Sequence, residues 1–269
     1  MEKLFGLIGE KLGHTYSPMI HNKILSHINI IGHYGLFQVK RENLKYVIQG
    51  LKALGYDGVN VTIPYKTEIM KYLDFISPEA KRIGAVNVIK IDNEGIATGY
   101  NSDYFGFGMS LNNANINIHR EKAVILGTGG ASKAIVQYLK DNKVREIIIV
   151  TRNISSAKEK YTEEKIITYE DLKNIKDSSL IINTTPVGMY PNIDNSPINI
   201  KILSNFFIAV DLIYNPFQTL FLKNAQEAGL KTLNGMYMLV AQAVKSQEIW
   251  NNITISPHII NEVEKLFYK

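Results

Sequence analysis

Short apolar runs alternate with amphipathic segments along the first hundred residues of the chain. Five runs are rich in β-branched or aromatic side chains and predict strands at residues 3–8, 34–39, 58–62, 85–91 and 96–100. Helical spacing of apolar positions predicts helices at residues 17–26, 44–54 and 66–73. Such alternation implies a mostly parallel sheet covered by helices. Residues 92–95, Asp-Asn-Glu-Gly, have hairpin chemistry, so the last pair of strands should add an antiparallel strand.

A second alternating series follows, with strands expected at residues 123–126, 146–150, 180–183, 207–211 and 231–233. This pattern is typical of a doubly wound sheet. Two further helices are expected at residues 102–114 and 235–250. The second of them is apolar on nearly every face from Met236 to Val244, which predicts that it is buried. Residues 253–268 are expected to return to the first series and pack on it.

The segment from Ala123 to Ser132 joins an apolar strand to a glycine-rich turn and then to a helix, expected at residues 131–140. Gly127 and Gly129 permit a turn and a close backbone approach that a Cβ atom would block. The helix N-terminus offers free N–H groups and the positive end of its dipole to a phosphate. The segment therefore predicts a dinucleotide-binding loop, although any strand-to-helix turn can use glycines for local reasons.

The end of the next strand indicates which dinucleotide is bound. An NAD enzyme places an acidic residue there, about 20 residues after the glycines, to bind the ribose 2′-hydroxyl. This chain has Thr151-Arg152-Asn153 at that position and no acidic residue before Glu159. A guanidinium suits a 2′-phosphate, so NADP is favoured over NAD. The alternative for Arg152 is an ordinary solvated arginine on a loop.

Length, composition and charge narrow the class of protein. A chain of 269 residues with 45% hydrophobic content can form two cores, so we expect two domains. No apolar run approaches the length of a membrane span, and no signal peptide is evident, which predicts a cytoplasmic protein. The chain has no cysteine, and its histidines show no ligand spacing, so we expect no metal. The net charge of +5 is dispersed, which argues against nucleic acid as a partner.

We therefore expect an α/β protein of two domains with a cleft between them. The N-terminal, mostly parallel substrate domain would span residues 1–101, completed by the C-terminal helices at about 237–269. The Rossmann-type, doubly wound NADP-binding domain would span residues 102–236. Ligand sites form preferentially at domain junctions, which is where a reaction between two small molecules is expected.

Polar residues gather at the predicted strand ends of the first domain. Lys66 follows the strand segment Asn60-Val61-Thr62 and is expected to open the next helix, where the helix dipole would make its proton easier to release. Asp103 is expected at the start of the linking helix. Each residue has an ordinary alternative, since Lys66 could be an exposed side chain and Asp103 a helix-start acid. Their shared position, at the end of an α/β sheet where ligands bind, favours a functional role.

The ordered motifs of the chain resemble those of the shikimate dehydrogenase family, and the resemblance covers nearly the whole chain. In the first half these motifs are His-Thr-Tyr-Ser-Pro (14–18), Asn-Val-Thr-Ile-Pro-Tyr-Lys (60–66), Gly-Ala-Val-Asn (84–87) and Asn-Ser-Asp (101–103). In the second half they are Gly-Thr-Gly-Gly-Ala-Ser (127–132), Thr-Arg-Asn (151–153), Asn-Thr-Thr-Pro-Val-Gly-Met (183–189), Asp-Leu-Ile-Tyr-Asn-Pro (211–216) and residues 235–242.

The resemblance implies an NADP-dependent oxidoreductase that reversibly reduces 3-dehydroshikimate to shikimate in aromatic amino acid biosynthesis. It makes Lys66 and Asp103 the catalytic pair. The implied substrate-binding residues are Thr15, Ser17, Thr62, Lys66, Asn87, Asp103, Tyr214 and Gln242. The implied cofactor-binding residues are Gly127, Thr128, Gly129, Gly130, Ala131, Thr151, Arg152, Asn153, Thr184, Thr185, Val187, Leu212 and Gly235.

Three departures from the family pattern bear on substrate and cofactor range. Thr15 replaces the first serine of the carboxylate motif, Ser102 replaces a threonine, and residues 151–153 replace the more common Asn-Arg-Thr. All three keep hydroxyl or amide chemistry. Two alternatives therefore stay open, a quinate/shikimate dehydrogenase with relaxed NAD or NADP use, and a non-catalytic sensor. The protein is expected to be a monomer or a homodimer, with no membrane partner.

Overall fold

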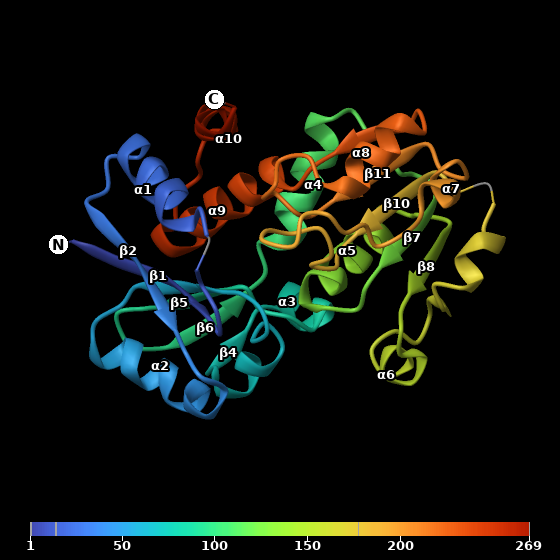
Figure 1. Cartoon of the computed structure of the whole chain (residues 1–269). Coiled ribbons are helices and arrows are strands. Elements are labelled where there is room, and N and C mark those ends of the chain that lie inside the picture. The colour runs from blue at the N-terminus through green and yellow to red at the C-terminus, as the bar shows by residue number, and fades with distance from the viewer. Residues whose placement is uncertain (1, 14, 177, 269) are drawn as a thin grey trace. The chain divides into compact units, whose positions relative to one another are not determined.

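The computed structural model describes residues 2–13, 15–176 and 178–268 (Figure 1). The chain divides into two compact units, unit 1 formed by Met1–Phe107 with Val240–Lys269 and unit 2 by Gly108–Leu239. Each unit contains one six-stranded sheet. The boundaries lie inside helices α4 (Asp103–Asn113) and α9 (Met236–Asn251), so each of these helices begins in one unit and ends in the other.

The sheet of unit 1 has the strand order β2-β1-β3-β5-β6-β4. Its strands are β1 (Lys3–Gly9), β2 (Gly32–Gln38), β3 (Gly58–Val61), β4 (Phe75–Ile76), β5 (Val88–Ile91) and β6 (Ala97–Tyr100). Only β5 runs antiparallel to its neighbours β3 and β6, whereas the other neighbouring pairs are parallel. In the β5–β6 hairpin, Asp92 accepts hydrogen bonds from the N–H groups of Glu94 and Ile96. The predicted mostly parallel sheet with one antiparallel strand is confirmed.

Helices cover both faces of this sheet, with α2 on one face and α1 and α9 on the other (Figure 1). The helices of unit 1 that are not shared with unit 2 are α1 (Ser17–His27), α2 (Leu44–Ala53), α3 (Pro78–Ile83) and α10 (His258–Glu264), with 3₁₀ helices η1 (Arg41–Asn43), η2 (Glu68–Tyr72) and η4 (Lys265–Phe267). Val59 and Val61 pack on the α2 face. Because side chains alternate along a strand, Asn60 lies on the opposite face, among apolar side chains.

The sheet of unit 2 is entirely parallel, with the order β12-β11-β10-β7-β8-β9. Its strands are β7 (Lys122–Leu126), β8 (Glu146–Val150), β9 (Lys165–Ile167), β10 (Leu180–Asn183), β11 (Ile208–Asp211) and β12 (Lys231–Leu233). The helices are α5 (Gly130–Asp141), α6 (Ile154–Lys158), α7 (Ile200–Leu203) and α8 (Leu220–Glu227), with 3₁₀ helix η3 (Asp171–Asn174). This is the doubly wound order, whose direction of winding reverses between β7 and β10. The predicted Rossmann-type fold is confirmed.

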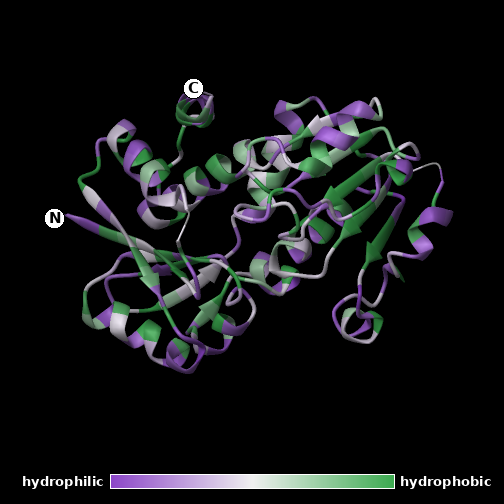
Figure 2. Cartoon of the chain, in the orientation of Figure 1, coloured by the Kyte–Doolittle hydropathy of each residue, from purple (hydrophilic) through white to green (hydrophobic). Residues whose placement is uncertain are grey.

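The central strands of unit 2 are fully buried, which explains their continuous apolar sequences. Figure 2 shows hydrophobic colour along the strands in the middle of this sheet. Helix α9 is buried at Met236, Tyr237 and Met238 and again from Val240 to Val244 except at Gln242, so its predicted burial is confirmed. No described helix is long and apolar enough to span a membrane.

Candidate active site

Lys66 lies in a turn of residues 63–67 that follows β3 and precedes η2. The helix predicted at residues 66–73 is present only as the 3₁₀ helix η2 (Glu68–Tyr72), so the prediction that Lys66 opens an α-helix is wrong, and so is the dipole argument built on it. The physical reason is that the Lys66 carbonyl forms its backbone hydrogen bond with another segment of the chain. The Lys66 carbonyl accepts a hydrogen bond from the Val86 N–H at 2.7 Å, whereas an α-helix would need the N–H of residue 70. Neighbouring side chains, not a helix dipole, determine the environment of Lys66.

The structure brings the predicted catalytic pair together. Lys66 Nζ donates a hydrogen bond to Asp103 Oδ2 at 2.6 Å, and Asn87 Nδ2 donates to Asp103 Oδ1 at 2.8 Å. The Lys66 side chain is 14% exposed and that of Asp103 is 7% exposed, so the ion pair is largely shielded from solvent. Asp103 is also the first residue of α4, where the helix dipole favours a negative charge. The pair has the desolvated, oriented geometry that proton transfer requires.

Ser102 connects this pair to Gln242 of α9. Its N–H donates to Asn87 Oδ1 at 2.7 Å, and its hydroxyl donates to Gln242 Oε1 at 3.3 Å. Asn87 Nδ2 also donates to the Ser102 hydroxyl at 3.1 Å. Four of the predicted substrate residues, Lys66, Asn87, Asp103 and Gln242, therefore belong to one hydrogen-bonded group in unit 1.

The predicted carboxylate-binding segment places two hydroxyl groups side by side at the start of α1. The Thr15 hydroxyl donates to Ser17 Oγ at 3.0 Å, and the Ser17 N–H donates to Thr15 Oγ1 at 3.2 Å. Thr62 lies just after β3, and its N–H bonds to the Ile8 carbonyl at 2.9 Å. His14, which belongs to the same motif, lies outside the described residues. Neighbouring hydroxyls can donate hydrogen bonds to a carboxylate without adding charge.

The glycine loop of unit 2 has the geometry expected of a phosphate cradle. Gly127 has φ +104°, and a Cβ atom there would lie 2.8 Å from Thr185 Cγ2, so the turn itself requires glycine. Gly129 differs, because a Cβ atom there would meet no protein atom within 4 Å. Gly129 also precedes α5 without any side-chain cap, which leaves the first N–H groups of the helix available. Thr128, Gly130 and Ala131 complete this loop and are half-buried.

The residues predicted to recognise the 2′-phosphate follow β8, as expected. Arg152 is exposed, and its charge lowers the pKa of Tyr169 against the larger, opposing effect of burial. Thr151 is buried, and its hydroxyl accepts a hydrogen bond from the Asn153 N–H at 3.1 Å. The Asn153 side chain caps α6 by accepting from the Ser156 N–H at 3.0 Å. Thr151 and Asn153 thus shape the loop, and Arg152 presents a guanidinium that fits a phosphate.

The loop after β10 carries three more predicted cofactor residues. The Thr184 hydroxyl donates to the Leu126 carbonyl at 2.7 Å, which ties this loop to the end of β7. The Thr185 hydroxyl donates to Asn183 Oδ1 at 2.7 Å and accepts from the Val187 N–H at 3.3 Å. The side chains of this loop therefore lie next to the glycine loop, at the position where a doubly wound sheet binds its dinucleotide.

The remaining predicted residues of unit 2 lie after β11 and β12. Leu212 and Tyr214 follow β11 and are half-buried. A Cβ atom on Gly235 would overlap the Leu212 carbonyl oxygen, so glycine is needed for the close backbone approach there. Tyr214 belongs to unit 2, whereas the other predicted substrate residues belong to unit 1.

Two buried polar residues, Asp211 and Asn60, belong to the sequence motifs, but their sequence positions alone predict no role for them. Asp211 is fully buried and accepts hydrogen bonds from Thr219 Oγ1 at 2.7 Å, Asn183 Nδ2 at 3.0 Å and the Ile213 N–H at 3.1 Å. Burial raises its pKa to about 7. Asn60 of β3 is likewise buried and hydrogen-bonded. The sequence signal that could have identified both residues is a polar side chain within an otherwise apolar strand.

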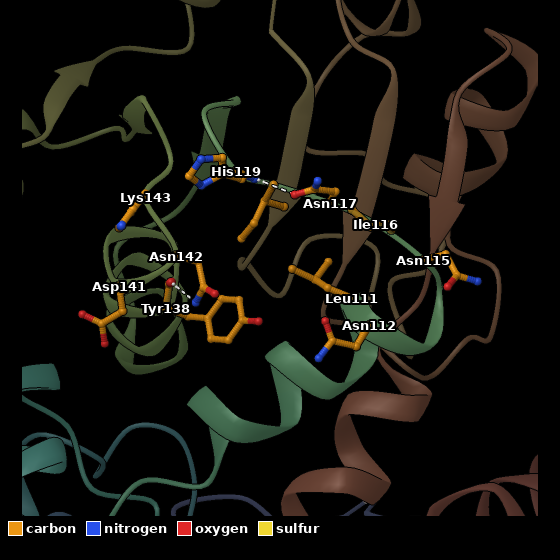
Figure 3. A pocket seen from close by; sticks show the side chains of 11 residues that line it. Leu111, Asn112, Asn115, Ile116, Asn117, His119, Tyr138, Asp141, Asn142 and Lys143 are labelled. Carbon is orange, nitrogen blue, oxygen red and sulfur yellow. Dashed lines mark hydrogen bonds between the residues drawn. The ribbon is translucent and has the colours of Figure 1, made fainter.

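A pocket of unit 2 lies apart from all of these residues. It is bordered by the C-terminal turns of α4 and α5 and by the segment before β7 (Figure 3), and it is lined by Leu111, Asn112, Asn115, Ile116, Asn117, Ile118, His119, Tyr138, Asp141, Asn142 and Lys143. None of the predicted site residues lines it. The segments 117–119 and 141–143 precede β7 and β8, at the opposite edge of the sheet from the glycine loop. Among the residues that the structure describes, no cluster of three metal-ligating side chains occurs.

The mixed unit with its lysine–aspartate pair and the parallel unit with its glycine loop and arginine define a two-domain, nicotinamide-dependent oxidoreductase. Residues 7–89 match the shikimate dehydrogenase substrate binding domain, and residues 110–194 match the shikimate / quinate 5-dehydrogenase family. The chain belongs to the shikimate dehydrogenase family.

Individual relatives match over nearly the whole chain. A shikimate dehydrogenase (NADP(+)) of Clostridium perfringens is 49% identical over 255 residues, 94% of each protein. A chorismate mutase/shikimate 5-dehydrogenase fusion protein from Clostridium acetobutylicum has a similar crystal structure, with TM-score 0.95, 48% identity and coverage of 100% of this chain and 98% of that one. The Thermus thermophilus shikimate 5-dehydrogenase in complex with NADP(H) and shikimate has TM-score 0.87 at 29% identity, covering 98% of this chain and 99% of that one.

Proposed function

We propose that the chain is an NADP-dependent shikimate dehydrogenase, which reversibly reduces 3-dehydroshikimate to shikimate with NADPH. The hydrogen-bonded group of Lys66, Asp103 and Asn87 is the observation that carries this proposal. Relatives of that activity match at least 92% of the chain, which supports it. A non-catalytic sensor would not need a lysine–aspartate ion pair that is largely shielded from solvent, so the pair argues against that alternative.

Lys66 handles the proton of the reaction. Bound NADP(H) supplies the hydride exchange. In the direction of reduction the Lys66 ammonium gives a proton to the substrate oxygen, and in the direction of oxidation Lys66 takes that proton from the hydroxyl. Asp103, which accepts the 2.6 Å hydrogen bond from Lys66 Nζ, restricts the ammonium to one position. Asn87 restricts Asp103 in turn.

The other polar residues of the site bind and orient the substrate. We assign Thr15 and Ser17, together with Thr62 and Tyr214, to the substrate carboxylate and its neighbouring hydroxyl groups. The ring hydroxyl groups are assigned to Asn87, Asp103 and Gln242. The clustering of hydroxyl and amide groups in unit 1 supports this assignment. A carboxylate-binding site made of hydroxyl groups contains no arginine, whose positive charge would compete for the phosphates of the cofactor.

Unit 2 binds NADP through the loop from Gly127 to Ala131 and the segment from Thr151 to Asn153. The open space beside Gly129 and the uncapped start of α5 fit a pyrophosphate, and the exposed Arg152 fits a 2′-phosphate. Thr185 and Val187 are assigned to the nicotinamide side of the cofactor, and Thr184, Leu212 and Gly235 complete the proposed cofactor-binding residues. The state of assembly, monomer or homodimer, and the cytoplasmic location stay predictions.

Steady-state rates on two substrates with two cofactors test this proposal. Shikimate and quinate are each assayed with NADP⁺ and with NAD⁺, following absorbance of the reduced nicotinamide. We expect shikimate with NADP⁺ to have the highest kcat/KM. Comparable values for quinate, or for NAD⁺, would identify the alternative enzyme with relaxed specificity. Absence of turnover with every combination would refute the proposal.

A further inference from the structure

A buried hydrogen-bond path runs through unit 1 between its two groups of predicted substrate residues. Tyr34 of β2 lies at the centre of this path and is only 3% exposed. The Tyr34 hydroxyl donates to Asn60 Oδ1 at 2.8 Å. It also forms a hydrogen bond with the Ser17 side chain. Burial raises the pKa of Tyr34 well above its ordinary value, and the hydrogen bond with Ser17 has the smaller, opposite effect. Tyr34 therefore contacts the carboxylate-binding segment directly.

Asn60 continues the path towards Asp103. Its Nδ2 donates to the Asn87 carbonyl at 3.1 Å and to Ser246 Oγ of α9 at 2.9 Å. Ser246 Oγ lies 3.3 Å from Ser102 Oγ, and the N–H of Ser102 holds the Asn87 side chain. Asn87 then donates to Asp103. The oxygen and the nitrogen of the Asn60 amide are thus both engaged inside the protein.

The location of Asn60 is costly unless these bonds are made. Its strand neighbours in register are Leu7 of β1 and Val88 of β5, and both belong to the apolar core against α1 and α9. An amide buried there without partners would destabilise the fold, whereas a valine would simply fill the space. A polar side chain at this position therefore indicates a role beyond packing.

Ring stacking fixes the orientation of Tyr34. The His21 ring lies parallel to the Tyr34 ring, with centroids 4.0 Å apart and an interplanar angle of 8°. His21 Nδ1 is 3.0 Å from Gln247 Nε2 of α9. Burial lowers the pKa of His21 to about 3, so its ring is neutral at working pH and brings no charge to the path. Tyr34 is consequently restricted in both position and rotation.

We propose that Tyr34 is a positioning residue, whose hydroxyl holds Ser17 in place and, through Asn60, Ser246 and Ser102, holds the Lys66–Asp103 pair in its catalytic geometry. This inference rests on the proposed function, because it assigns Tyr34 to the same reaction. Neither Tyr34 nor Asn60 needs to touch the substrate. Loss of the hydroxyl should disturb both ends of the path and leave the cofactor site in unit 2 unchanged.

The test removes the hydroxyl and keeps the ring. The kcat and KM values for shikimate and NADP⁺ are measured for the wild type, Tyr34→Phe, Lys66→Ala and the double variant. We expect Tyr34→Phe to lower kcat and raise the shikimate KM by about fivefold each, the size of one lost hydrogen bond. The KM for NADP⁺ should stay within about twofold. In the Lys66→Ala background, the further loss of kcat should shrink below about twofold, because the positioned group is already gone.

Tyr65→Phe is the matched control. Tyr65 is fully buried in the same unit, but its hydroxyl donates to the Val39 carbonyl at 2.6 Å, outside the path. We expect this variant to keep the wild-type kcat. An equal loss in Tyr65→Phe, an undiminished loss in the Lys66→Ala background or unchanged kinetics of Tyr34→Phe would each overturn the inference.

The same assay also provides a substitute variant and separates failure of the positioning role from failure of the proposed function. Should Tyr34→Phe fail to fold, as judged by circular dichroism, Ser246→Ala replaces it under the kcat criteria alone, because it breaks the path between Asn60 and Ser102 and leaves the contact of Tyr34 with Ser17 intact. A folded wild type without shikimate-dependent NADPH formation would refute the proposed function itself. Normal wild-type turnover with an unaffected path variant would refute the positioning role alone.

Discussion

Burial of His21 gives the protein a specific sensitivity to acid. Its pKa is about 3 in the fold, against an ordinary value of 6.5. Below pH 6.5 the unfolded chain binds a proton that the folded chain does not, so the free energy of unfolding falls as the pH falls. The loss should reach up to about 1.4 kcal/mol per pH unit down to about pH 3.

His21→Phe isolates this effect, since phenylalanine keeps a ring against Tyr34 and cannot titrate. Denaturant unfolding of the wild type and the variant, measured from pH 7.5 to about 4, checks it. We expect the wild type to lose stability relative to His21→Phe as the pH falls. A constant difference between the two proteins over this range would contradict the buried, neutral state of His21.

Asp211 should show the opposite dependence on pH. Burial raises its pKa to about 7 in the fold, from the ordinary 3.8. Between these values the unfolded chain loses a proton that the folded chain keeps, so the free energy of unfolding falls as the pH rises. The expected slope is again up to about 1.4 kcal/mol per pH unit, opposite in sign to that of His21.

Asp211→Asn is a close mimic of the protonated carboxyl. Its oxygen can still accept from Asn183 and Ile213, and its nitrogen can donate to Thr219 Oγ1. Denaturant unfolding should show the wild type losing stability relative to Asp211→Asn between about pH 4 and pH 7. A relative gain by the wild type over that range would show that the carboxylate, not the acid, is the favoured native form.

Among individual residues, the proximity of Lys66 and Asp103 and the position of the glycine loop could be predicted, because the ordered motifs resemble those of a known family. The positioning residues could not. Tyr34 and Ser246 are separated from Asn60 by 26 and 186 positions in the sequence, and only the folded sheet and α9 bring them together. The position of Asn60 among apolar neighbours was the one local signal.

At the scale of elements, two glycines of the loop before α5 should respond differently to substitution. Gly129 has an extended backbone with φ −79°, and a Cβ atom there has open space around it. Gly129→Ala should therefore leave thermal stability unchanged but raise the KM for NADP⁺, since the methyl group occupies the approach of the pyrophosphate. A steric cost of about 1–3 kcal/mol between the methyl group and the pyrophosphate would raise the KM for NADP⁺ by roughly 5- to 150-fold.

Gly127→Ala is the contrasting variant. Its φ of +104° and its contact with Thr185 make any side chain strained, so this variant should lose stability. Thermal melting and NADP⁺ kinetics of both variants check the pair. A destabilised Gly129→Ala with an unchanged KM for NADP⁺ would show that Gly129 serves the fold and not the cofactor.

Most long, periodic elements could be predicted, and the failures have physical causes. Strand β4 has only two residues, too few for a hydrophobic pattern to show. The helix expected at residues 66–73 has an apolar spacing that fits a helix, but the Val86 N–H takes the Lys66 carbonyl out of the helical ladder. That competition comes from a neighbouring segment, which a local pattern does not contain.

At the scale of the whole molecule, alternation of strands and helices predicted both sheets. The one antiparallel strand of unit 1 followed from the Asp92 to Gly95 turn, and the reversal of winding in unit 2 followed from its glycine loop and strand series. Together the two units divide the work of the proposed reaction, with the proton-transfer pair in unit 1 and the cofactor loop in unit 2.

The central claim is that this chain oxidises and reduces its substrate with Lys66 as the proton carrier. The most direct test compares kcat for NADP⁺-dependent oxidation of shikimate between the wild type and Lys66→Ala, followed by NADPH absorbance. We expect a wild-type rate that depends on shikimate, and a loss of about 10²- to 10⁴-fold in kcat for the variant with a modest change in the shikimate KM. An unchanged kcat in a folded Lys66→Ala protein would contradict the account.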